Sequence, residues 1–135
     1  MQDPVQRSTR DGVATLTLSR GKVNAIEETV VSSLQRHFRD IQNEQDVRSV
    51  ILTGTGSFFS FGFDIPHFLS FSKEEFTRFV TDFADLYTQI FLFPKPVVAA
   101  LNGHAVAGGC MLPTACDRGC ATPLHLRQAK TGISR

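Results

Sequence analysis

Two stretches of this chain place small residues where backbone N–H groups can meet an oxygen atom. The first, Ala105 to Gly109, separates an apolar run at 97–101 from a second one at 110–112. The pattern predicts a strand buried on both faces, a turn, and a helix over 110–115. A helix that begins there directs free N–H groups at an anion, or at an oxygen that becomes one during a reaction. A Gly-Gly pair is also common in ordinary turns, so this stretch alone leaves both interpretations open.

The second stretch runs from Phe58 to Ile65 and places four Phe residues around Ser60 and Gly62. Its composition predicts an apolar wall with a bend in it. Asp64 follows the bend and is expected to cap a short helix over 65–69, with orientation of the bend as its alternative role. The two stretches therefore have the same character and lie about 45 residues apart.

The composition limits the classes of function. The chain has 135 residues, a net charge of +1 and 20% charged residues, which predict one globular domain and give no electrostatic argument for nucleic acid. The three cysteines match no common zinc spacing and predict reduced thiols. No apolar stretch is long enough to span a bilayer, so we expect a soluble, intracellular protein without membrane contacts.

The elements that position these stretches follow from periodicity and from capping residues. Strands are expected over 5–9 and 13–19, joined by a turn at 10–12, and a third strand over 49–53. Helices are expected over about 27–45 and from Ser72, where Glu75 completes a capping box, to the residue before Pro94. The second helix is expected to bury a stripe that belongs to the core and not to a cofactor site, namely Phe76, Phe79, Val80, Phe83, Leu86, Tyr87 and Ile90.

In this order, the motifs resemble the enoyl-CoA hydratase/isomerase (crotonase) superfamily. The resemblance rests on a Val-Asn-Ala loop at 23–25, on Phe59 to Ile65, and on the segment from Pro94 through Gly108-Gly109 to Asp117. It implies an α/β fold, a spiral of β-β-α turns. Only the N-terminal part of that core domain is expected, over 1–117, followed by an irregular, divergent or truncated tail over 118–135.

The resemblance also implies an acyl-CoA thioester as the binding partner. Coenzyme A is then part of the substrate, and neither a separate cofactor nor a metal is expected. The backbone N–H groups of Phe63 and Gly108 correspond to the oxyanion hole that stabilises an enolate. The family motif assigns substrate binding to Lys22, Val23, Ala25, Ser60, Phe61, Gly62, Asp64, Ile65 and Gly109. Lys22 meets a phosphate of CoA or remains a solvated loop charge, two alternatives that stay open.

Departures from the family pattern bear on the reaction. Hydratases of the family carry a glutamate three residues after the oxyanion glycine, where this chain has Met111. The pattern therefore looks more like the Δ3,Δ2-enoyl-CoA isomerases, which use a single glutamate about fifteen residues after Asp117. Arg135 stands near that place, and no Asp or Glu follows Asp117.

Several alternatives remain at the level of the sequence. The chain is an enoyl-CoA isomerase or hydratase, or a catalytically inactive family member that binds acyl-CoA or a protein. A peptidase of the related fold would need Ser60 with His67 or His104, without an elbow motif around the serine. The family usually forms homotrimers or hexamers, which is doubtful for so short a chain. The expected location is the cytoplasm, or a mitochondrion or peroxisome for a longer eukaryotic parent.

Overall fold

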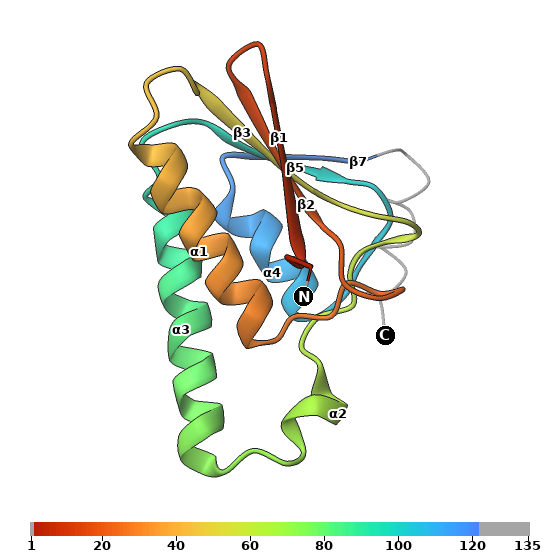
Figure 1. The fold of residues 1–135 in the computed structure, drawn as a ribbon. Coiled ribbons are helices and arrows are strands. Elements are labelled where there is room, and N and C mark those ends of the chain that lie inside the picture. Colours follow the sequence, from red (N-terminus) through yellow and green to blue (C-terminus); the bar gives the residue numbers. More distant parts are fainter. Residues whose placement is uncertain (1, 122–135) are drawn as a thin grey trace.

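The computed structural model describes residues 2–121, which form a mixed sheet covered by helices (Figure 1). The strands are β1 (Val5–Arg10), β2 (Val13–Leu18), β3 (Ser49–Gly54), β5 (Val97–Leu101) and β7 (Arg118–Ala121), in the spatial order β1-β2-β3-β5-β7. Only the β1–β2 pair is antiparallel, and the other neighbours are parallel. Two short strands, β4 (Phe58–Ser60) and β6 (His104–Ala105), pair separately. This arrangement confirms an α/β fold with helical crossovers between parallel strands.

The N-terminal hairpin forms where the sequence predicts it. Asp11 and Gly12 both have positive φ, 52° and 80°, as the two central residues of a type I′ turn require. Arg10 pairs with Val13 across this turn, and Val5 pairs with Leu18 at the other end. The register places the alternating residues Ala14, Leu16 and Leu18 in the core.

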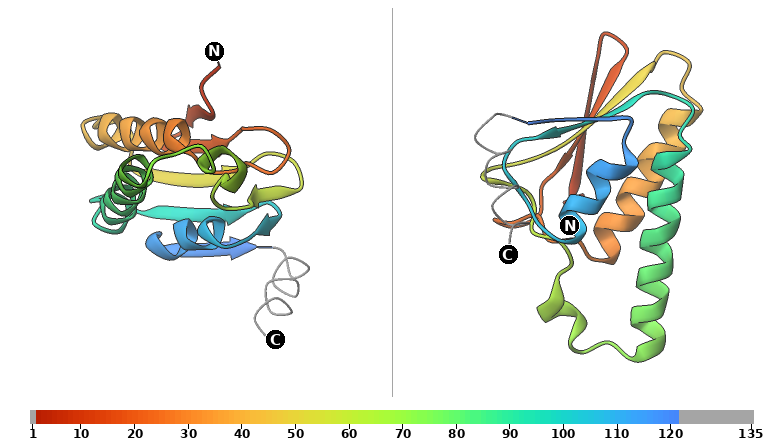
Figure 2. Two further views of the ribbon diagram at one scale, coloured as in Figure 1. Left: turned by 90° about the horizontal axis from the view of Figure 1, so that it is seen from below. Right: turned by 180° about the vertical axis from the view of Figure 1, so that it is seen from behind.

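Helices α1 (Glu28–Gln42) and α3 (Lys73–Phe91) lie side by side on one face of the sheet, and α4 (Gly108–Ala115) lies next to α3 (Figures 1 and 2). The Ser72 hydroxyl accepts from the Glu75 N–H while the Glu75 carboxylate accepts from the Ser72 N–H, which confirms the predicted capping box. The short helix α2 (Ile65–Phe68) is capped by Asp64, also as predicted. None of the helices within 2–121 is long and apolar enough to cross a bilayer.

The prediction that the strand at 97–101 is buried on both faces is wrong. Val97 and Ala99 are buried, whereas Val98, Ala100 and Leu101 are only partly so. In the described residues the helices cover one face of the sheet, so alternate side chains of β5 have a helix over them and the others do not (Figure 2).

The predicted stripe of α3 is correct over its C-terminal half and wrong at its start. Phe79, Phe83, Leu86 and Ile90 are buried, but Phe76 is 37% and Val80 41% exposed, and Tyr87 is half-buried. The first turns of α3 extend beyond the start of α1 and beyond the sheet (Figure 1). Those two side chains are therefore only partly covered, Phe76 by the ring of Phe68, whose centroid lies 5.5 Å away.

Strand β7 falls within the segment for which an irregular tail is expected, and that expectation is wrong for Arg118–Ala121. The strand lacks an apolar run because most of its side chains are exposed, so the sequence gives no signal for it. Asp117 attaches this strand to the sheet, since its carboxylate accepts from the Val97 N–H at 2.7 Å and its N–H donates to the Val97 carbonyl. Asp117 thus has a structural role at the edge of the sheet. Residues 122–135, including Arg135, lie outside the described part.

Candidate active site

The backbone N–H of Gly108 lies in the turn between β6 and α4. Ala107 has φ 49° and ψ −120°, and the Gly109 N–H donates to the Val106 carbonyl at 2.8 Å, which together define a type II′ turn. The Ala107 carbonyl accepts from the Cys110 N–H, so the Gly108 N–H in the same peptide points out of the helix. It has no acceptor among residues 2–121.

A second such N–H lies at Phe63, in the bend that follows β4. The Ile26 N–H donates to the Gly62 carbonyl at 2.7 Å, and the Asp64 N–H donates to the Ile26 carbonyl at 2.9 Å. Carbonyl and N–H of a trans peptide point in opposite directions, so the Phe63 N–H points away from Ile26. No acceptor for it is found within the described residues.

The two bends are in direct contact. Gly62 has φ 98°, and a Cβ built on it would lie 2.9 Å from the Val106 carbonyl oxygen and 3.1 Å from the Gly108 nitrogen. A Cβ on Gly108 would lie 3.0 Å from the ring of Phe63. The backbone comes this close only because both positions are glycine. Two N–H groups without acceptors therefore flank one contact, a pattern suited to an oxygen that gains negative charge.

Ser60 holds the two bends in place from inside. It is fully buried; its hydroxyl donates to the Asn24 carbonyl at 2.7 Å and accepts from the Gly62 N–H at 3.1 Å. Its own carbonyl accepts from the Val106 N–H, and Gly109 packs directly on it. Because the Ser60 hydroxyl has these partners and no histidine among them, the arrangement offers no nucleophilic serine for a peptidase.

The loop at 22–25 lies against the same bend. The Val23 carbonyl accepts from the Phe61 N–H at 2.9 Å, which places the loop beside the second stretch. Lys22 is exposed, while Val23 and Ala25 are partly buried. Phe61 and Ile65 are 52% and 57% exposed, so both offer apolar surface next to the bend.

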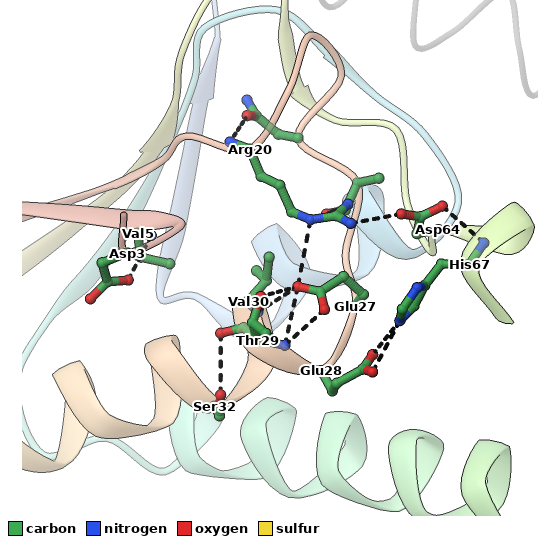
Figure 3. Close-up of polar contacts among 12 residues, drawn as sticks. Asp3, Val5, Arg20, Glu27, Glu28, Thr29, Val30, Ser32, Asp64 and His67 are labelled. Atoms are coloured by element: carbon green, nitrogen blue, oxygen red, sulfur yellow. Dashed lines mark hydrogen bonds and ion pairs between the residues drawn. The ribbon is translucent and has the colours of Figure 1, made fainter. Parts of the chain in front are cut away.

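Figure 3 shows a polar cluster behind the bend, centred on Arg20, Glu27, Asp64 and the His67–Glu28 pair. Arg20 donates to the Asp64 carboxylate at 2.8 Å, and Asp64 accepts from the His67 N–H at the start of α2. Burial opposes ionisation of Asp64, but these hydrogen bonds and the Arg20 charge outweigh it, and the pKa of Asp64 lies below its ordinary value. Asp64 is therefore both a helix cap and a link from the bend to Arg20.

Glu27, Glu28 and His67 bring their ligand atoms within 4.8 Å of one another. The Glu27 carboxylate caps α1 by accepting from the N–H groups of Thr29 and Val30, and Arg20 lies 3.5 Å from it. The positive charge of Arg20 beside this carboxylate would repel a metal cation. The expectation of a site without a metal or a separate cofactor stays a prediction.

Sequence reasoning missed Arg20, Asn24 and Glu27 as structural parts of this site. Asn24 is 2% exposed with φ 49°, and its side-chain amide donates to the carbonyls of Thr55 and Phe58. The only signal for it was its place in the Val-Asn-Ala loop. Arg20 gave none, because its partners Ala25 and Asp64 are brought to it only by the fold.

Comparisons with known proteins identify the family. A family model described as enoyl-CoA hydratase/isomerase matches residues 8–123. A "Probable enoyl-CoA hydratase" of Bacillus subtilis (strain 168) is 35% identical over 105 residues, which are 77% of this chain and 41% of that protein. A peroxisomal fatty acid β-oxidation multifunctional protein of Arabidopsis thaliana is 36% identical over 115 residues, 84% of this chain and 16% of that protein.

Solved structures give the same result. An enoyl-CoA hydratase from Bacillus anthracis superposes with a TM-score of 0.84 and 29% identity, over 87% of this chain and 47% of that one. An enoyl-CoA hydratase from Thermoplasma volcanium gives 0.83 and 30%, over 89% and 48%. The chain thus spans about half or less of the length of these relatives. It has the crotonase fold and belongs to the enoyl-CoA hydratase/isomerase family.

Proposed function

We propose that this chain binds an acyl-CoA thioester and polarises its carbonyl between the N–H groups of Phe63 and Gly108. The observation that carries the proposal is the contact of the two bends, each with one N–H that has no acceptor within 2–121. A backbone donor of this kind contributes about 3–4 kcal/mol when negative charge develops on the oxygen. The N-terminus of α4 adds a partial positive charge at the same place.

The other predicted residues fit positions around such a ligand. Val23 and Ala25 lie in the loop beside the bend, where they would contact the CoA moiety, and the exposed Lys22 is free to meet a phosphate. Phe61 and Ile65 supply exposed apolar surface for the acyl part. Gly62, Asp64, Ser60 and Gly109 would act through the backbone they hold rather than through contacts of their side chains.

The reaction class we propose is a double-bond shift of the enoyl-CoA isomerase type. Met111, 47% exposed on the first turns of α4, stands where a hydratase glutamate is expected, and a thioether accepts no proton in this chemistry. The hydratase alternative is supported by the names of the relatives in the two Bacillus species. Either reaction needs a proton acceptor besides the two amides, and a family member that lacks one would act as an acyl-CoA-binding module instead.

Calorimetric titration with acetoacetyl-CoA tests the proposal. Gly108→Pro removes the N–H, and Gly108→Ala is the matched control because it retains the N–H while adding the Cβ that approaches the Phe63 ring. We expect the Pro variant to bind about three- to tenfold more weakly than the Ala variant, since a hydrogen bond to a neutral carbonyl contributes about 0.5–1.5 kcal/mol. Equal affinities of the two folded variants would refute the role of this N–H.

Conversion of the substrate separates an enzyme from a binding module. An isomerase moves the double bond of an enoyl-CoA and a hydratase adds water across it, whereas a binding module leaves the ligand unchanged. We therefore propose to follow 3-enoyl-CoA and 2-enoyl-CoA by NMR in the presence of this chain. Binding without conversion of either ligand would reject both enzyme alternatives for this chain and support the binding module. Trimer formation and the cellular compartment stay predictions.

A further inference from the structure

Arg20 contacts three residues from two segments of the chain behind the bend. Its Nη1 donates to the Ala25 carbonyl at 3.2 Å, its Nη2 donates to the Asp64 carboxylate at 2.8 Å, and its Nε lies 3.5 Å from the Glu27 carboxylate (Figure 3). These partners belong to the loop after β2, to the start of α2 and to the cap of α1. One guanidinium group therefore joins the loop, the bend and a helix N-terminus.

The backbone of Arg20 is fixed as well. Its N–H donates to the Asn24 side-chain carbonyl at 2.9 Å, and its carbonyl accepts from the Asn24 N–H at 3.1 Å. Asn24 is itself anchored to the carbonyls of Thr55 and Phe58. The side chain of Arg20 is 32% exposed and that of Asp64 20%, so their ion pair is partly shielded from solvent. Both the backbone and the guanidinium group of Arg20 are thus held by hydrogen bonds to other parts of the fold.

Two of the side-chain contacts of Arg20, to Ala25 and Asp64, lie on opposite sides of the backbone bridge between Ile26 and residues 62–64 that orients the Phe63 N–H. Ala25 precedes Ile26, which forms one side of this bridge, and Asp64 ends the other side. With the proposed function as its premise, we propose that Arg20 is a positioning residue, whose guanidinium holds the bridge closed and so keeps the Phe63 N–H aimed at the thioester oxygen.

Arginine suits this task better than lysine. A guanidinium presents five donors in a fixed plane and can satisfy a carbonyl and two carboxylates at once, whereas an ammonium group is a point charge on a flexible stem. We therefore expect Arg20→Lys to restore only part of what Arg20→Met removes. Asp64→Asn keeps an oxygen for the cap of α2 but loses the charge that pairs with Arg20.

The first experiment compares the affinity of each variant for acetoacetyl-CoA with its affinity for free CoA, by calorimetry. Free CoA lacks the thioester carbonyl. A loss of affinity confined to acetoacetyl-CoA therefore reports on the orientation of the Phe63 N–H and not on general loss of structure. Arg20→Met is expected to lower the thioester affinity at least about tenfold relative to CoA, because hydrogen bonds to charged groups contribute about 1.5–3 kcal/mol. Arg10→Met, at a side chain 93% exposed, is the matched control and is expected to change neither affinity.

Equal losses for CoA and thioester would overturn the positioning role. A double-mutant cycle adds a second criterion: Arg20→Met combined with Asp64→Asn should cost little more than Arg20→Met alone, since the two side chains act through one contact. Fully additive losses would contradict the proposal. Arg20→Lys and Asp64→Asn keep these criteria usable if Arg20→Met does not fold.

Amide hydrogen exchange tests, in the unliganded protein, whether Arg20 holds the bridge closed. The N–H groups of Ile26 and Asp64 are the two donors of the bridge. We expect both to exchange at least about tenfold faster in Arg20→Met than in the parent chain, while buried amides of β2 and β3 keep their rates. Unchanged rates at Ile26 and Asp64 would overturn the inference. If these two amides exchange faster in Arg20→Met but the parent chain binds no thioester, Arg20 holds the bridge closed and the proposed function is rejected.

Discussion

Gly62→Ala tests the contact on which the site depends. Gly62 has φ 98°, a conformation that costs an alanine about 1–2 kcal/mol. The new Cβ would also lie 2.9 Å from the Val106 oxygen, 3.1 Å from the Gly108 nitrogen and 3.3 Å from the Ala107 Cβ. Two of these neighbours are backbone atoms that cannot move aside without opening the turn, and overpacking of this kind costs about 1–3 kcal/mol.

The unfolded state changes in the opposite direction. Replacing glycine by alanine reduces the conformational freedom of the unfolded chain and stabilises the protein by about 0.4–1 kcal/mol. The net expectation for Gly62→Ala is a decrease of about 3 kcal/mol in the free energy of unfolding. Gly56→Ala is the matched control, because Gly56 also has positive φ, 72°, but no atom of residues 2–121 lies within 4 Å of a Cβ built on it. Its expected loss is about 1 kcal/mol or less.

Equilibrium unfolding in urea, followed by far-ultraviolet circular dichroism, measures both variants. The chain has no Trp and a single Tyr, so the backbone signal is a better probe than fluorescence. A change in the urea midpoint at constant slope gives the difference in stability directly. If Gly62→Ala loses no more than Gly56→Ala, the two bends are not in the contact described, and the argument for the paired N–H groups fails with it.

Two further predictions concern the interior of the site and its polar cluster. Ser60→Ala should lower the free energy of unfolding by about 2 kcal/mol, since the Asn24 carbonyl and the Gly62 N–H both lose a buried partner. Ser70→Ala, at an exposed serine, should stay within about 0.5 kcal/mol, and a similarly small loss at Ser60 would contradict the reasoning. The hydrogen bond of His67 to Glu28 raises the pKa of His67. The stability that this contact contributes is therefore fully present below the unfolded pKa of about 6.5 and is lost as the pH rises through the raised folded pKa. A proton NMR titration should find the pKa of His67 closer to its ordinary value in Glu28→Gln, and an unchanged pKa would count against the pair.

The sequence predicts those features whose causes lie within a few residues. The turn at Asp11-Gly12 and the capping box at Ser72 and Glu75 are such cases, and the structure confirms both. The exposure of Phe76 depends instead on where α1 begins beside it. The pairing of β7 depends on the free edge of strand β5. Neither cause can be read from the local pattern, so both predictions there were wrong.

The candidate site divides in the same way. Backbone donors can be predicted from the local sequence, because only small residues allow Gly62 to approach Gly108 so closely. The small residues in the two stretches are that local pattern. No local sequence pattern indicates a role for Arg20, since an arginine after a strand is common and its partners Ala25 and Asp64 are recognised only in the folded structure. Side chains whose partners are distant in the sequence, as Asp64 is from Arg20, are therefore the part of such a site that only the three-dimensional structure can identify.

Ala107 shows how firmly the surroundings fix the turn. Its φ of 49° and ψ of −120° belong to the position of a type II′ turn where glycine is preferred, so the alanine holds the turn at a cost of about 1–3 kcal/mol. That strain persists because Gly109 packs on Ser60 and Gly62 packs on Gly108, which leave the turn no other conformation. The same contacts fix the peptide that carries the Gly108 N–H. An oxyanion donor must not reorient when charge develops on its ligand, and a strained turn enclosed by close backbone contacts meets this requirement before any ligand binds.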